Sequence, residues 1–466
     1  MKSSPFRFPV WRAVLSTLAF GLSVAGAQAA RPVAFAENGG LKMLYDNRQY
    51  PQAVAHGDTV YIVWRGRDGL PYLRTYDLTS REFGEARSML KDVDPQAFVI
   101  KAAKYRKDHH FAPVIWLDGR GHLRSMFGCH NTAGVHVVSR EARSPEGWVS
   151  AGSPSESMSY PKVHRILGGR TLVYYRHTGH LGSWRYRVLA DGAGDWEGPA
   201  KTTVDLNAKP QEGRLADHAG SYNTTAVSAD GTRLHVAFIW KVEEPVFNQR
   251  YQTTLSDHAQ RHNLYHFFVD LATHQAFNIF GEPVELPLRK SVADKKCLVW
   301  DTDGRVAAVG PSIALDRHGL PHFMLPVSDR NPQDSHFHFV TWNEGKWRRV
   351  QAAPTLHPFN ASHVEALPKG GFRAFLVVGE NQTVIEEGMD EYGWGERVEE
   401  WRSSDNGLKW ARSQDLTPKG RPGWHWQNVQ PVHDAAGRVI PDLILFYGWP
   451  DREGAGTGFL WDGRGG

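Results

Sequence analysis

Cysteine is nearly absent from the 466-residue chain, which contains only Cys129 and Cys297. A framework of several disulfides therefore cannot be the main source of stability. One disulfide, two free thiols and two metal-bound thiolates all remain compatible with this pair.

Long hydrophobic runs are also missing after the first thirty residues. No later segment approaches the roughly eighteen consecutive apolar residues that suggest a membrane-spanning helix. The N-terminus has Lys2, Arg7 and Arg12, then an apolar run over 13–24 and small residues up to Ala29. This pattern predicts a secretory signal peptide that is cleaved after Ala29. We expect export to the periplasm or the medium, and no membrane partner.

The chain has no block of basic residues. Its formal net charge of +4 falls to about +1 without the three cations of the leader. A near-neutral protein without a basic patch is a poor ligand for nucleic acid. We therefore expect no nucleic-acid partner, and we expect a monomer.

The sequence also lacks segments with a helical periodicity of apolar residues, and it has short strand-like runs instead. Alternating runs flanked by Gly, Asp, Asn or Pro occur throughout, for example over 59–64, 123–127, 234–240 and 443–447. This pattern is typical of an all-β protein.

A weak internal repeat organises these runs. In each copy an apolar strand meets a turn rich in Asp or Gly, and a second apolar strand follows. Seven copies begin at Val54, Val114, Val163, Ala226, Ile313, Ala366 and Val432. Over residues 30–466 this gives about 62 residues per copy, enough for a four-stranded blade. The sequence predicts one catalytic domain, a seven-bladed β-propeller of four-stranded antiparallel blades.

Residues 403–410, Ser-Ser-Asp-Asn-Gly-Leu-Lys-Trp, match the Asp-box form S-x-D-x-G-x-x-W. We expect the Asp to accept hydrogen bonds from backbone N–H groups and the Trp to pack between strands. The motif indicates neuraminidase-like repeats and carries no chemistry. A tandem β-sandwich or a solenoid is the alternative, but no Pro/Ser/Gly-rich linker divides the chain.

Two of the predicted hairpins carry residues suited to catalysis. His110 precedes the turn of the second repeat and His130 follows it, so both imidazoles should reach the same rim. Tyr160 and Arg176 have the same relation in the third repeat. Adjacent blades should bring the four residues together.

Two His, one Tyr and one Arg suit β-elimination at a uronate better than hydrolysis. An Arg beside the sugar carboxylate makes the C5 proton more acidic, a His or Tyr removes that proton, and a Tyr or His protonates the leaving oxygen. No metal is required if the Arg neutralises the carboxylate.

The order of these motifs also resembles a known family. His110-x-x-Pro113, His130-Asn131-Thr132, Tyr160-Pro161 and Tyr175-Arg176 are similar to segments of seven-bladed propeller polysaccharide lyases with BNR-type repeats. That group includes ulvan lyases and rhamnose-glucuronate lyases. The resemblance extends to Ser221-Tyr222-Asn223 and to the segment from Arg261 to Tyr265.

The resemblance implies roles for single residues. Tyr160 would act as acid and also as a candidate base, one of His110 and His130 as base, and Arg176 as the neutralising cation. His109 would replace His110 if the loop register differed by one residue. Further residues are expected to bind substrate, namely His109, Asn131, Tyr222, His262 and Asn263.

Other sites are compatible with the sequence. A structural zinc ion could be held by Cys297 with His258, His262 or His266, and by His336 or His338, although none has the spacing of a zinc finger. A structural calcium ion is equally compatible.

Three alternative functions are also compatible with the sequence. A glycoside hydrolase would need two of Asp217, Glu243, Glu244, Glu386 and Glu387 on one rim. A sialidase would use a triad such as Arg176, Arg214 and Arg250 with a nucleophilic Tyr and a Glu. A non-catalytic carbohydrate-binding propeller would use some of the 17 Trp as stacking platforms.

The function expected from the sequence is a polysaccharide lyase. It would cleave a glycan at a glucuronate or iduronate and leave a 4,5-unsaturated uronyl end.

Rhamnose-linked polymers such as ulvan, or rhamnose-capped glucuronate side chains, are the expected substrates. The choice between them, and between endo and exo action, depends on the shape of loops around the site.

Overall fold

The computed structural model describes residues 30–40, 44–91, 93, 109–190, 194–206, 219–242, 261–328, 335–380, 393–450 and 454–464. In these ranges most of the secondary structure is β-strand. The helices among them are α3 (Lys290–Lys296) and the short 3₁₀ helices η2 (His109–Phe111) and η3 (Leu167–Gly169). None of the described helices is long and apolar enough to cross a membrane. The predicted all-β class is confirmed.

The described strands form six sheets. The first has the order β1 (Val33–Gly39), β31 (Gly456–Asp462), β30 (Val439–Pro450), β29 (Trp424–Asp434), β2 (Ala53–His56), β3 (Thr59–Arg65), β4 (Pro71–Asp77) and β5 (Arg87–Ser88). The second has the order β10 (Trp148–Ala151), β9 (Val135–Ser139), β7 (Leu123–Phe127) and β6 (Val114–Leu117). The third has the order β14 (Trp196–Val204), β13 (Trp184–Leu189), β12 (Thr171–His177), β11 (Met158–Arg165) and β8 (His130–Thr132).

The other three sheets follow in chain order. The fourth contains β15 (Ala219–Val227), β16 (Arg233–Val242), β17 (Arg261–Asp270), β18 (Ala276–Phe277) and β19 (Pro283–Val284), and β20 (Leu298–Trp300) also pairs with β17. The fifth contains β21 (Ser312–Leu315), β22 (Pro321–Ser328), β23 (Ser335–Asn343) and β24 (Lys346–Thr355). The sixth contains β25 (Ser362–Ala366), β26 (Phe372–Val378), β27 (Arg397–Ser403) and β28 (Ala411–Asp415).

Each of the seven sequence repeats forms an antiparallel hairpin. The pairs are β2–β3, β6–β7, β11–β12, β15–β16, β21–β22, β25–β26 and β29–β30. The prediction of uniform four-stranded blades is not reproduced sheet by sheet. A parallel pairing of β2 with β29 joins two hairpins into one eight-stranded sheet, and short extra strands enlarge the third and fourth sheets.

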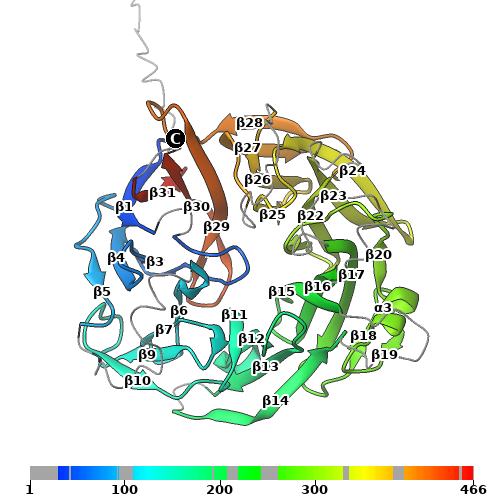
Figure 1. The fold of residues 1–466 in the computed structure, drawn as a ribbon, viewed down its shortest axis with the longest axis horizontal. Helices are drawn as coiled ribbons and strands as arrows, with labels where there is room; N and C mark the ends of the chain where they lie inside the picture. The colour runs from blue at the N-terminus through cyan, green and yellow to red at the C-terminus, as the bar shows by residue number, and fades with distance from the viewer. Residues whose placement is uncertain are drawn as a thin grey trace, which may run out of the picture.

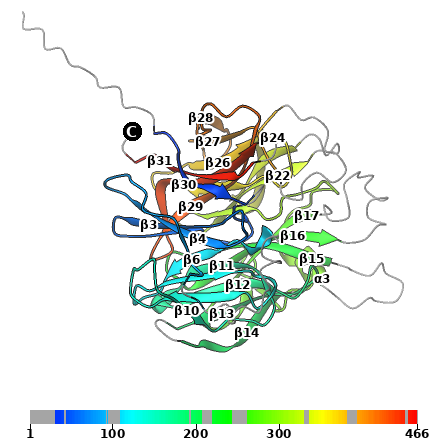
Figure 2. The same ribbon diagram turned by 60° about the vertical axis from the view of Figure 1, so that its left-hand side comes forward.

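The sheets follow one another around a ring (Figure 1). Strands β6, β11, β15 and β25 lie toward its centre, whereas β10, β14 and β28 lie on the outer rim. Figure 2 shows the same sheets from the side. Strands inside the ring are buried on both faces, as in β26, because neighbouring sheets cover them. Their continuous apolar sequences reflect this double burial.

The core lies between neighbouring sheets rather than within one of them. Trp116 and Met126 of the second sheet, for example, pack with Val173 and Tyr175 of the third. Both cysteines are buried and free, so no disulfide joins them.

The Asp-box of residues 403–410 forms the predicted turn between β27 and β28. Asp405 accepts hydrogen bonds from the Ser403 hydroxyl and from the Lys409 N–H, both at 2.8 Å. The Trp410 ring lies 5.1 Å from that of Phe339 in the neighbouring sheet. The motif therefore links two sheets, and its predicted structural role is confirmed.

Candidate active site

Three adjacent strands of the third sheet place the first site residues in one row. His130 of β8 pairs with Ser159 of β11, and Ser159 pairs with Arg176 of β12. Pairing across strands brings residues that are distant in sequence to within a few ångströms of one another.

Tyr160 follows Ser159 and interrupts the regular pairing. The register of β11 with β12 shifts between Ser159 and Lys162, and Tyr160 has a left-handed backbone with φ of 58°. That conformation is uncommon for a bulky residue. Bulges of this kind redirect a side chain, and they are frequent beside active sites.

His110, His130 and Tyr160 form a cluster of three rings. The two imidazole centroids lie 4.1 Å apart. The Tyr160 ring lies 5.7 Å from His110 and 5.8 Å from His130. The predicted meeting of the second and third repeats is confirmed, because η2 and β8 carry both imidazoles to the start of β11.

Two guanidinium groups lie against the Tyr160 ring. The Arg176 guanidinium carbon is 4.8 Å from the ring centroid, and that of Arg48 is 4.7 Å away. Asp46 orients Arg48 through two side-chain hydrogen bonds of 2.7 and 2.6 Å. All three nitrogens of the fully buried Arg176 lack a hydrogen-bond partner among the described residues.

Tyr222 of β15 occupies the centre of a cationic cluster. Its ring centroid lies 4.6 Å from Arg261, 5.7 Å from Lys241 and from Arg48, and 5.8 Å from Arg176. These are distances at which a cation and an aromatic face attract one another. The Tyr222 and Tyr160 rings are themselves 5.9 Å apart.

This environment moves the pKa values of the two phenols in opposite directions. Burial raises the pKa of Tyr160 above its ordinary value, and the opposing effect of Arg48 and Arg176 does not offset it. Burial also raises the pKa of Tyr222, but Lys241, Arg261, Arg176 and Arg48 together lower it well below its ordinary value. Paired groups whose pKa values diverge are suited to separate acid and base roles.

The other predicted substrate-binding residues lie in different surroundings. Asn131 is exposed beside His130, and its side chain accepts a hydrogen bond from Ser159 at 3.1 Å. His109 begins η2, directly before His110.

His262 and Asn263 make contacts away from the two tyrosines. His262 is buried and donates from Nδ1 to the Arg305 carbonyl at 3.0 Å. Asn263 accepts a hydrogen bond from the Thr302 N–H and donates to the Tyr265 hydroxyl. These contacts hold the loop after β20 against β17.

The predicted zinc site gains no support from the described residues. Cys297 is buried, and burial raises the pKa of its thiol to about 12, which disfavours the thiolate that zinc requires. No group of three or more potential ligands occurs in the described part of the chain. His258 lies outside it.

Several acidic and basic candidates also fall outside the described ranges. They are Asp217, Glu243, Glu244, Glu386 and Glu387 of the hydrolase alternative, and Arg214 and Arg250 of the sialidase alternative.

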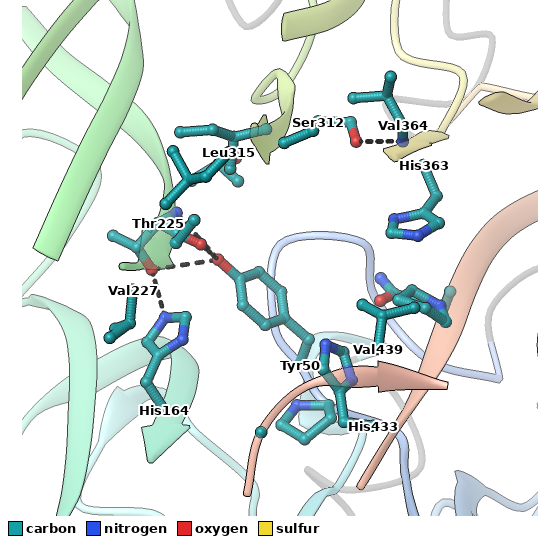
Figure 3. Close-up of a pocket in the computed structure, with 18 of the residues that line it drawn as sticks. Tyr50, His164, Thr225, Val227, Ser312, Leu315, His363, Val364, His433 and Val439 are labelled. Carbon is teal, nitrogen blue, oxygen red and sulfur yellow. Dashed lines mark hydrogen bonds between the residues drawn. The ribbon is translucent and has the colours of Figure 1, made fainter. Parts of the chain in front are cut away.

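A cavity of about 490 Å³ lies beside the cluster formed by Tyr160, Tyr222 and the surrounding cations. Arg48 belongs to both the cluster and the cavity wall. Figure 3 shows His164, His363 and His433 on its wall together with Tyr50. The Tyr50 hydroxyl donates to the Thr225 carbonyl at 2.8 Å, and His164 Nε2 lies 2.7 Å from the Thr225 hydroxyl. The lining carries both charge signs, with Arg165 and Arg317 as well as Asp316 and Glu365.

Sequence reasoning missed four charged residues of the site. Asp46 and Arg48 precede β2, Lys241 is the penultimate residue of β16 and Arg261 begins β17. Arg261 opens a segment that resembles the lyase family, but its charge was given no role there, and the other three residues belong to no recognisable motif. Their meeting depends on how the sheets follow one another around the ring.

The arrangement combines the parts that acid–base chemistry on an anion needs. Buried cations can hold and neutralise a carboxylate, two imidazoles can exchange protons, and one phenol is kept neutral beside another that favours ionisation.

The sequence comparison identifies the family. Residues 59–354 match the model of the BNR repeat-containing family, and the chain belongs to that family. The repeat class expected from the sequence is therefore confirmed.

Curated relatives of the chain include two ulvan lyases. The chain is 25% identical to that of Nonlabens ulvanivorans over 59% of its own length, and 23% identical to that of Alteromonas sp. (strain LOR) over 64%. The matches cover 64% and 63% of these relatives, so the chain spans slightly less than two thirds of their length.

Solved structures with a similar fold include two polysaccharide lyases. One is a PL25 ulvan lyase bound to -[GlcA(1-4)Rha3S]-, with a TM-score of 0.69, 17% identity, and coverage of 93% of this chain and 96% of that one. Another is the polysaccharide lyase Uly1, with a TM-score of 0.59, 11% identity, and coverage of 95% and 93%. At these identities the likeness concerns the fold.

Proposed function

We propose that the protein is a polysaccharide lyase that cleaves at a uronate by β-elimination. The observation that carries the proposal is Arg176, a buried guanidinium without a described hydrogen-bond partner, lying beside Tyr160 and two imidazoles. Burying a cation costs desolvation free energy unless an anion pairs with it. A substrate carboxylate would supply that anion.

The residue roles follow from this placement. Arg176, assisted by Arg48, would hold the carboxylate and make the C5 proton more acidic. A base would take that proton, the C4=C5 double bond would form, and the C4–O bond would break. Tyr160, whose pKa is raised by burial, would give its proton to the leaving oxygen.

Three groups are candidates for the base. His110 and His130 lie closest to Tyr160 by ring contact. Tyr222 joins them, because the surrounding cations lower its pKa and favour the phenolate. No metal is required in this scheme, so a chelator should leave the rate unchanged.

The proposed substrate class rests on the cations Arg176 and Arg48, which suit an anionic sugar, and on the similarity to ulvan lyases. We propose a glucuronate- or iduronate-containing polymer, with rhamnose-linked chains such as ulvan first among the candidates. The product would carry a 4,5-unsaturated uronyl end. Such polymers lie outside cells, which agrees with export.

One observation favours a second candidate function, hydrolysis of an anionic sugar. Arg48, Arg176 and Arg261 surround Tyr222, as three Arg and a Tyr would in a sialidase. In the described part of the chain, however, the charged groups that act on Tyr222 are cations, and no Glu partner is found among them.

One assay separates these functions. The protein would be incubated with ulvan, gum arabic and a sialoside panel, while the ultraviolet absorbance of the conjugated unsaturated uronate and the number of new reducing ends are followed. A lyase produces both signals. Reducing ends without the absorbance would support the hydrolase, and binding without product would support a carbohydrate-binding protein.

We also propose that the fold is a seven-bladed propeller in one domain over residues 30–466. Dividing the eight-stranded sheet at the parallel pair β2–β29 gives two four-stranded units, β1 with β29–β31 and β2–β5. Together with the other five sheets they make seven units, one for each repeat.

A further inference from the structure

Lys162 is a fully buried lysine on β11, two residues after Tyr160. Its ammonium nitrogen donates hydrogen bonds to the carbonyls of Arg48 and Tyr160. It also lies 4.6 Å from the centroid of the Trp184 ring. One side chain thus joins the backbone of two residues that flank the proposed reaction centre.

The Tyr160 carbonyl belongs to a strained part of the chain. A left-handed backbone is strained at a bulky residue such as Tyr160 and persists only where its surroundings hold it. The Tyr160 N–H donates to the Cys129 carbonyl at 3.4 Å, and the Tyr160 carbonyl accepts from the Lys162 amine at 3.3 Å, so one long hydrogen bond holds each side of this residue.

The Arg48 carbonyl belongs to a segment that runs beside β11. The Tyr50 N–H donates to the Pro161 carbonyl, and the Val163 N–H donates to the Tyr50 carbonyl. Lys162 extends this pairing to Arg48, whose guanidinium is fixed in turn by Asp46. Lys162 therefore links the backbone of Arg48 directly to that of Tyr160.

Stability alone does not explain a lysine at this position. Burial lowers the pKa of Lys162 well below its ordinary value; Asp46 opposes this effect, and Arg48 and Arg176 add to it. An apolar side chain would avoid the cost of placing an amine there. Charged or neutral, the amine still has at least two N–H donors, one for each carbonyl.

We propose that Lys162 is a positioning residue that fixes the bulged backbone of Tyr160 against Arg48 and thereby aims the Tyr160 hydroxyl. It acts through Tyr160 and touches no substrate. This inference rests on the proposed function for its kinetic test, but its structural part can be tested without activity.

The main variant is Lys162→Met, which keeps the length of the side chain and removes the donors. We expect kcat on the cleaved polymer to fall about 10- to 100-fold with KM little changed, because a small misplacement of a reacting group costs about that much. In the Tyr160→Phe background the same substitution should cause no further loss. Equal, additive losses in both backgrounds would overturn the proposal.

The matched control is Tyr174→Phe. Tyr174 pairs with Lys162 across the hairpin, and its hydroxyl bonds to Thr203 and Asn223 instead of Tyr160. This variant loses buried hydrogen bonds in the same hairpin and should keep the wild-type kcat. A similar loss of kcat in the control would assign the effect to the hairpin and overturn the proposal.

Crystal structures of the variants separate this inference from the proposed function. If the wild type cleaves none of the polymers, the proposed function fails, but the φ angle of Tyr160 in Lys162→Met still reports on the tether. An unchanged φ and an unchanged Arg48 position would overturn the inference. Lys162→Gln, whose shorter side chain still carries two N–H donors, provides a milder variant, and failure of both variants to fold would assign Lys162 to stability alone.

Discussion

Tyr160 and Tyr222 lie with their ring centroids 5.9 Å apart, yet their pKa values shift in opposite directions. The difference arises from the number of cations around each ring. Arg48 and Arg176 lie near both, whereas Lys241 and Arg261 add their charge to Tyr222. The site therefore holds one neutral phenol beside one that favours the phenolate.

Tyr222→Phe should remove a phenolate signal that is present below about pH 10. Free tyrosine ionises only near pH 10, whereas the cations lower the pKa of Tyr222 well below that value. The wild-type minus Tyr222→Phe ultraviolet difference spectrum, recorded over a range of pH, should show the phenolate band at pH values below about 10. Because the folded-state pKa is lowered, the stability that this group contributes is complete above about pH 10 and is lost as the pH falls through the folded-state pKa.

Tyr160→Phe is the control for that measurement. The raised pKa of Tyr160 keeps its phenol neutral, so its difference spectrum should stay flat until the pH exceeds about 10. A phenolate band from Tyr160 below about pH 10, or none from Tyr222 in that range, would contradict the assigned environments.

The hairpins and half of the site could be predicted from the sequence. Each apolar–turn–apolar repeat is local, and residues at the two ends of a hairpin must meet, as Ser159 and Arg176 do. His110 and His130 came together for the same reason.

The rest depends on contacts between distant segments. Arg48 reaches Tyr160 only because the segment before β2 runs beside β11, which no local pattern indicates. The parallel pairing of β2 with β29 is equally non-local, and it merged two predicted blades into one sheet. The bulge that aims Tyr160 has no signature in the sequence either, because Tyr rarely adopts a left-handed backbone.

Arg176→Ala should abolish measurable cleavage. The substitution removes the cation that would neutralise the uronate, and we expect kcat/KM to fall by at least about 100-fold, as when a charge-stabilising group is removed from other active sites. Arg176→Lys keeps the positive charge but lacks the planar guanidinium that can bind a carboxylate through two hydrogen bonds. This variant should therefore retain only part of the rate. The ultraviolet assay measures both variants, and near-wild-type cleavage by Arg176→Ala would remove this residue from the mechanism.

Ser403→Ala should destabilise the protein without affecting cleavage. The buried Ser403 hydroxyl donates to Asp405 and accepts from the Gly407 N–H at 2.9 Å, so both bonds would be lost. We expect a loss of about 1–3 kcal/mol in the free energy of unfolding, measured with urea. Changed kcat or KM in the folded variant would indicate that this Asp-box communicates with the site.

His262→Gln should reduce the dependence of the free energy of unfolding on pH in the acid range. Burial lowers the pKa of His262 to about 4, and an unfolded His titrates near pH 6.5. The unfolded chain thus binds the proton first, and the stability present above pH 6.5 is lost as the pH falls toward 4, at up to about 1.4 kcal/mol per pH unit. Urea unfolding at several pH values should show a smaller slope in the variant, whose amide can still donate to the Arg305 carbonyl.

The same variant tests whether His262 binds substrate. Its contact with Arg305 predicts a structural role, so kcat and KM at neutral pH should match the wild type. An increase in KM with an unchanged acid slope would reverse this conclusion and return His262 to the substrate-binding residues. Asn263→Ala is the companion variant, because its side chain holds Thr302 and Tyr265. If the loop after β20 only supports the sheet, this variant should lower the free energy of unfolding and leave KM unchanged.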